Sequence, residues 1–213
     1  MKQAAISLTI AALLGLSQAF DRQALASWFV GLNPDKVILA INSGASEDIT
    51  DQTGFTYQAD AYFTGGATSA DGEQIQWALP NADAYHTERW GNFKYQLPMP
   101  TNQDAKYTLI LKFSEIYFQE PGQKVFDIKI GSTTIIRDLD IFDKLTSRGI
   151  PYDEFVEIKV QGSKVFANGV EAKDGLKNGK LVIDFVQGKA DNPKVNAIVL
   201  VEGGKENTHF KSF

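Results

Sequence analysis

Short apolar runs, separated by Gly, Asn and Pro, follow one another along the chain after Pro34. Runs of about four to eight residues rich in Val, Ile, Phe and Tyr are typical of β-strands. The predicted strands cover residues 37–41, 107–113, 125–130, 134–138, 155–160, 181–186 and 196–201. No long helical pattern lies between them, so parallel crossovers are not expected. The pattern predicts an all-β fold, an antiparallel β-sandwich of jelly-roll type.

Several predicted strands alternate apolar and polar residues, which indicates one buried face in each strand. The residues that would share these faces are Tyr107, Leu109, Leu111 and Phe113, then Phe126, Ile128 and Ile130, and then Leu181, Ile183 and Phe185. Asn168-Gly169 and Asn178-Gly179 separate such runs and suit tight hairpin turns, because both residue types tolerate positive φ. Residues 44–97 are broken by small polar residues and predict loops and short strands over one rim of the sandwich.

The N-terminus predicts segments outside the sandwich. Residues 1–19 have the basic start, short apolar centre and small residues near Ala19 of a cleavable secretory signal peptide. Residues 20–34 predict a short helical extension, with Leu25, Trp28, Phe29 and Leu32 at helical spacing. The main domain is predicted at residues 35–203, with a polar tail at 204–213. No stretch is long enough for a transmembrane anchor, so we expect a luminal or secreted protein of the secretory pathway or endoplasmic reticulum.

Composition excludes several classes of function. The net charge of −5 comes from acidic and basic residues mixed along the chain, so a nucleic-acid partner is not expected. With two His and no Cys, no Ser/His/Asp or Cys/His catalytic set can be assembled. Gly65-Gly66 neither follows a strong strand nor opens a helix, so it does not predict a phosphate loop. We therefore predict no enzyme, no cofactor and no metal.

The adjacent aromatics Tyr117 and Phe118 follow the predicted strand at residues 107–113 and precede a turn at Pro121-Gly122. If the strand has ended, both rings lie together at the rim of the sheet; if it continues, they point to opposite faces. Exposed rings suit sugars, because the apolar C–H face of a pyranose stacks on them. The pattern is equally consistent with rings that close the open end of the sandwich.

A second aromatic cluster runs from Tyr85 to Trp90, and its Trp90 ring could instead belong to the core. Its charged members Glu88 and Arg89 are candidates to orient sugar hydroxyls, or they pair with each other at the surface. Asp191, in Asp191-Asn192-Pro193, offers a carboxylate that can accept two hydrogen bonds from hydroxyls, although this sequence is also an ordinary turn.

Several segments in order along the chain resemble the malectin domain family, lectins of the endoplasmic reticulum. They are Ala40-Ile41-Asn42-Ser43-Gly44, Thr87-Glu88-Arg89, residues 111–118, Lys124-Val125-Phe126-Asp127, residues 138–143 and residues 191–195. The resemblance implies a jelly roll whose rim loops hold a glucose disaccharide, and partners that are glucosylated oligosaccharides, N-glycans or glycoproteins bearing them.

Position by position, the resemblance assigns sugar binding to Tyr117, Phe118 and Asp191, and Trp90 stands where the family has a tyrosine. A further family tyrosine has no clear counterpart; alignment places Asp71 near it. Tyr85, Glu88 and Arg89 are the other secondary candidates.

Two other functions fit parts of the sequence. Asp138, Asp140 and Asp143, with Asp153 and Glu154, could supply the carboxylate pair of a glycoside hydrolase or the ligands of a calcium ion. Related domains in plant receptor ectodomains suggest instead a module that binds proteins or peptides.

Overall fold

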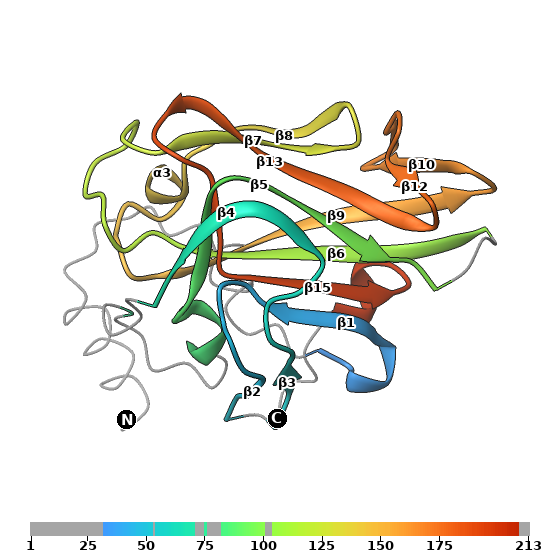
Figure 1. Ribbon diagram of the computed structural model, residues 1–213, viewed down its shortest axis with the longest axis horizontal. Helices are drawn as coiled ribbons and strands as arrows, with labels where there is room; N and C mark the ends of the chain where they lie inside the picture. The colour runs from blue at the N-terminus through green and yellow to red at the C-terminus, as the bar shows by residue number, and fades with distance from the viewer. Residues whose placement is uncertain (1–31, 53, 71–74, 76–81, 101–103, 209–213) are drawn as a thin grey trace, which may run out of the picture.

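Two antiparallel β-sheets pack face to face (Figure 1). This computed structural model describes residues 32–52, 54–70, 75, 82–100 and 104–208. The six-stranded sheet has the order β1 (Val37–Asn42), β15 (Ala197–Glu202), β6 (Ala105–Ser114), β9 (Pro151–Gln161), β10 (Lys164–Ala167) and β11 (Val170–Glu171). The predicted antiparallel sandwich is therefore confirmed.

The second sheet is seven-stranded. Its order is β14 (Lys194–Val195), β5 (Glu88–Pro98), β13 (Lys180–Ala190), β7 (Val125–Ile130) and β8 (Thr133–Leu139), with β4 (Phe63–Ser69) beside β5 and β12 (Leu176–Lys177) beside β13. The remaining elements are the pair β2 (Ile49–Thr50) and β3 (Thr56–Tyr57), the helix α3 (Ile141–Leu145), and the 3-10 turns η1 (Pro34–Lys36), η3 (Ala82–Tyr85) and η4 (Lys205–Thr208).

The core lies between the two sheets. Every residue that the alternating pattern assigned to a buried face belongs to one apolar cluster. Strand β6 is buried on both faces, because a second cluster that includes Tyr57, Tyr85 and Ile110 covers the outer side of its sheet. The segment that precedes β5, which contributes Tyr57 and Tyr85, therefore forms a third layer over the six-stranded sheet.

Both predicted hairpin turns are confirmed. Asn168 and Gly169, with φ of 48° and 81°, join β10 to β11, and Asn178 and Gly179, with φ of 52° and 71°, join β12 to β13. Positive φ at both central residues is the requirement of a type I′ turn, which matches the twist of the paired strands.

The prediction of loops and short strands across residues 44–97 is wrong for its last ten residues, 88–97, which belong to the long strand β5. Strand β5 pairs with β13, β4 and β14 inside the seven-stranded sheet, and its Phe93, Tyr95 and Leu97 are buried in the core. The predicted signal peptide and most of the predicted helical extension lie outside the described residues. Among the residues that are described, no helix is long and apolar enough to span a membrane.

Candidate functional site

Tyr117 and Phe118 belong to the loop between β6 and β7. This loop lies at the end of the sandwich where α3 is found (Figure 1). Strand β6 has ended at Ser114, so the two rings sit together, edge to face, with centroids 5.0 Å apart. Tyr117 is 77% exposed and Phe118 is half-buried. A ring so exposed cannot be there to fill the end of the core.

The loop that carries these rings is held by side chains of its own segment. Glu115 is buried, and its Oε1 accepts hydrogen bonds from the backbone N–H of Tyr117 (2.8 Å) and of Phe118 (3.0 Å). Gln123 Oε1 does the same for Gln119 and Glu120, both at 3.1 Å. These bonds fix the backbone from which both rings project.

Asp191 reaches the aromatic pair through a residue that the sequence did not single out. Lys124 Nζ lies 2.5 Å from Asp191 Oδ2, donates to the carbonyl of Asn192 at 3.1 Å, and stands 5.4 Å from the centre of the Phe118 ring. The Asp191 side chain remains 32% exposed. Within the described part of the chain its Oδ1 has no hydrogen-bond partner, so one carboxylate oxygen is free to accept from a ligand hydroxyl.

Trp90 lies on β5 directly opposite Lys194 of β14 and is 37% exposed. Opposed residues of an antiparallel pair project from the same face of the sheet. Lys194 uses that face to reach the carbonyl of Ser114 at 2.5 Å, where the loop of Tyr117 begins. Among the interactions of the described residues, none joins Trp90 to Tyr117, Phe118 or Asp191, and Trp90 does not line the pocket beside the aromatic pair, so its place in the site stays a prediction.

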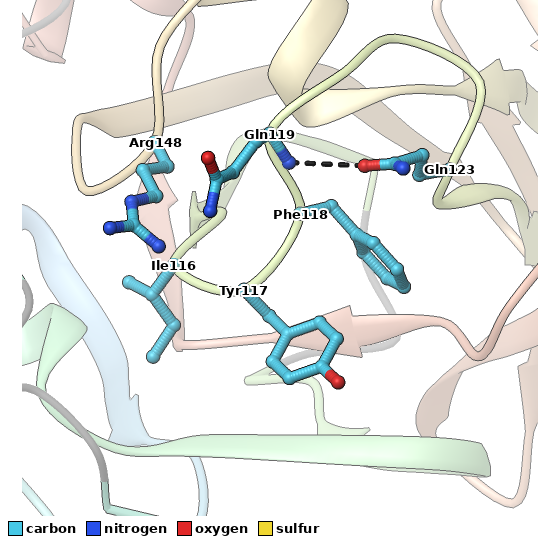
Figure 2. A pocket seen from close by; sticks show the side chains of 6 residues that line it. All are labelled: Ile116, Tyr117, Phe118, Gln119, Gln123 and Arg148. Carbon is cyan, nitrogen blue, oxygen red and sulfur yellow. Dashed lines mark hydrogen bonds between the residues drawn. The ribbon is translucent and has the colours of Figure 1, made fainter.

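An open pocket of about 600 Å³ adjoins the aromatic pair and is lined by Ile116, Tyr117, Phe118, Gln119, Gln123 and Arg148 (Figure 2). Arg148 comes from the segment between α3 and β9. Gly149 N, next to it, donates to the carbonyl of Glu115 at 2.5 Å, which ties this segment to the aromatic loop.

Tyr85, a secondary candidate, does not belong to this site. It is 3% exposed, its hydroxyl donates to Asp153 Oδ1 at 2.6 Å, and it accepts from Lys112 Nζ at 3.0 Å. Burial, together with the Asp153 carboxylate, raises the pKa of Tyr85 well above its usual value. The ring is packed against the outer face of the six-stranded sheet and cannot stack on a ligand.

Glu88 and Arg89 are engaged elsewhere, and not with each other. The Arg89 guanidinium is buried, binds Asp60 through Nε and Nη2 at 2.8 Å, and lies 3.4 Å from the centre of the Phe63 ring. Glu88 forms an ion pair with Lys194. Both residues position β5 against its neighbours. Asp71 lies outside the described residues.

Four of the five carboxylates weighed as a hydrolase pair or as calcium ligands contact other groups of the fold, and Asp143 takes part through its backbone N–H. Asp140 caps α3 by accepting from Asp143 N at 3.1 Å, and Asp138 pairs with Lys189 at 2.7 Å. Asp153 is buried against Lys112, and Glu154 accepts from the hydroxyl of Tyr152. In the described ranges, no group of three or more His, Asp or Glu side chains is arranged to hold a metal ion.

The role of Glu115 can be tested without a ligand. Gln at this position keeps an oxygen that accepts from the two backbone N–H groups, whereas Ala removes it. We expect the Glu115→Ala variant to show faster amide hydrogen exchange across residues 116–119, measured by mass spectrometry, while Glu115→Gln matches the native protein. Equal exchange in all three proteins would show that other contacts hold the loop.

Residues 37–198 match the malectin domain family. Malectin-A of Xenopus laevis is 33% identical over 173 residues, covering 79% of this chain and 61% of that protein. Human malectin is 31% identical over 174 residues, covering 80% and 58% respectively. The chain thus spans about three fifths of the length of these curated relatives.

Solved structures share the fold at lower identity. The ANX2 ectodomain from Arabidopsis thaliana superposes with a TM-score of 0.62 at 22% identity, over 78% of this chain and 49% of that one. The β-glucuronidase of Bacteroides uniformis superposes with a TM-score of 0.57 at 16% identity, over 78% and 18%. The family match covers most of the chain and the two-sheet architecture agrees with it: the chain belongs to the malectin domain family.

Proposed function

We propose that the domain binds carbohydrate without transforming it, and that its ligands are glucose-containing oligosaccharides such as the glucosylated N-glycans of secretory glycoproteins. The observation that carries the proposal is the Tyr117–Phe118 pair, held open to solvent beside a half-exposed carboxylate, on a malectin-type sandwich. Because such ligands occur in the secretory pathway, we place the protein in the endoplasmic reticulum or outside the cell as part of this proposal.

Each part of the site has a separate task in this proposal. The rings of Tyr117, Phe118 and Trp90 stack on the apolar faces of sugar rings, and Asp191 accepts hydrogen bonds from hydroxyls. Lys124 holds Asp191 in place and keeps the charge of its carboxylate balanced. Because the sugar hydroxyls and the protein groups must all give up water, a single site should bind with modest affinity.

An array of immobilised glycans tests the proposal. We expect the protein to bind a subset of glucose-terminated oligosaccharides, with free sugar of the same structure competing for binding. Absence of binding to every glycan class would overturn the proposal.

A pull-down from secretory extracts separates the proposal from a protein-interaction module, the alternative that the fold shared with receptor ectodomains raises. Capture of glycoproteins should end when their glycans are removed enzymatically. Capture that survives complete deglycosylation would favour recognition of protein surfaces.

A further inference from the structure

Arg148 lines the pocket beside Tyr117 and Phe118, and its positive charge is not paired with a carboxylate of the described residues. In the described part of the chain its guanidinium has no hydrogen-bond or ion-pair partner. Arg89 and Arg137, the other Arg residues in that part, each pair with an Asp. A half-buried guanidinium without a carboxylate is poorly compensated, since burial removes water that would otherwise solvate it.

The other polar groups of this wall are also able to donate. Gln123 uses its Oε1 to accept from the backbone N–H groups of Gln119 and Glu120, so its amide NH₂ is what remains for a ligand. The Gln119 side-chain amide has no partner among the described residues, and Gln119 lines the same pocket as Arg148 (Figure 2). None of the lining residues is acidic, in a chain whose net charge is −5.

The two ends of the site therefore differ in charge. Lys124 and Asp191 neutralise each other next to Phe118. Arg148, on the Ile116 and Gln119 side of the loop, has no such counter-charge (Figure 2). A planar guanidinium forms two parallel hydrogen bonds with a carboxylate or with the oxygens of a sulfate ester, which a neutral hydroxymethyl group cannot match.

We propose that Arg148 makes this pocket a subsite for an anionic group on the saccharide, a carboxylate or a sulfate ester, while a neighbouring sugar ring stacks on the aromatic pair. The inference rests on the proposed carbohydrate-binding function and adds to it a preference for saccharides that carry an anionic group next to the stacked sugar ring. Gln119 and Gln123 add amide donors, and the hydrogen bond between Gly149 N and the carbonyl of Glu115 holds the backbone next to Arg148 against the loop of the two rings.

Isothermal titration of the full chain tests this subsite. The probes are maltose, nigerose and cellobiose, each in three forms: neutral, with a carboxylate at C6 of the non-reducing glucose, and with a sulfate ester there. We expect the native protein to bind an anionic form about three- to tenfold more tightly than its neutral parent at low salt, the range for a partly exposed ion pair with good geometry. The preference should shrink as sodium chloride is added.

The Arg148→Gln variant should bind all three forms with the affinity of the neutral disaccharide. Arg137→Gln is the matched control, because it removes the same charge from a side chain that is 71% exposed on β8; it should keep the anionic preference. The anionic form that gains more affinity over the neutral disaccharide, the carboxylate or the sulfate ester, identifies the group that the subsite prefers.

Two outcomes would overturn the inference in distinguishable ways. If the native protein binds the neutral and anionic forms equally, or if Arg148→Gln retains the preference, the anionic subsite is refuted while carbohydrate binding stands. If no form binds at any concentration reached, and the glycan array is also blank, the proposed function fails and the subsite with it.

Discussion

Replacing Lys112 by Met should lower the free energy of unfolding by about 3–5 kcal/mol, the largest loss of stability we expect from any single exchange in this domain. Lys112 and Asp153 are each 2% exposed and lie 2.7 Å apart, and the hydroxyl of Tyr85 completes the group. Removing the ammonium leaves the Asp153 carboxylate buried without a counter-charge. Urea denaturation followed by fluorescence measures the change.

The matched control is Lys164→Met, because the Lys164–Glu171 pair has side chains that are 60% and 46% exposed and water screens it. Its loss should lie between about 0 and 1 kcal/mol. If Lys112→Met fails to fold, the double variant Lys112→Met/Asp153→Leu should fold, since neither charge is then left unpaired. If Lys112→Met lowers the free energy of unfolding no more than Lys164→Met does, the assignment of Lys112 and Asp153 as a buried structural pair is contradicted.

Replacing Tyr117 by Ala should weaken saccharide binding by about tenfold or more and leave the thermal unfolding midpoint almost unchanged. The ring is 77% exposed, so its removal takes stacking surface from a ligand and little packing from the fold. Titration of the best ligand from the glycan array, with differential scanning calorimetry of the same samples, separates the two effects. Adding Phe118→Ala should abolish binding, with a larger effect on stability because that ring is half-buried.

Tyr62→Ala is the control for this change, because Tyr62 is also exposed, at 43%, but lies where β4 begins, beside Gln96 of β5. It should bind the ligand like the native protein. Undiminished binding by Tyr117→Ala would show that the site lies elsewhere, and a large fall in its unfolding temperature would show that the ring serves the core.

Features set by near neighbours in the chain could be predicted from the sequence. The Asn168-Gly169 and Asn178-Gly179 turns follow from the positive φ that these residues tolerate, and the alternation along β6 follows from the two-residue repeat of a strand. Strand β5 was missed although Phe93, Tyr95 and Leu97 alternate, because Gly91 and the charged residues before it resemble a loop.

Features set by contacts between distant segments could not be predicted. Tyr85 and Arg89 look like surface residues in the sequence, and only the layer over the six-stranded sheet and the carboxylate of Asp60 explain their burial. Lys124 lies 67 residues from Asp191, and nothing local indicates that they pair. Arg148 likewise lines the pocket from the segment between α3 and β9, and nothing local in the sequence indicates that this segment meets the loop of Tyr117.

The buried Glu115 carboxylate also bears on the rate at which a ligand exchanges. Since its hydrogen bonds hold the backbone of Tyr117 and Phe118 before any sugar arrives, association needs no ordering of the loop and should proceed in a single fast step. With fast association, the modest affinity of a single site would result from a high dissociation rate. Under the proposed function, the protein should sample and release each glycan quickly, so prolonged residence on a glycoprotein would require several glycans within reach of one another.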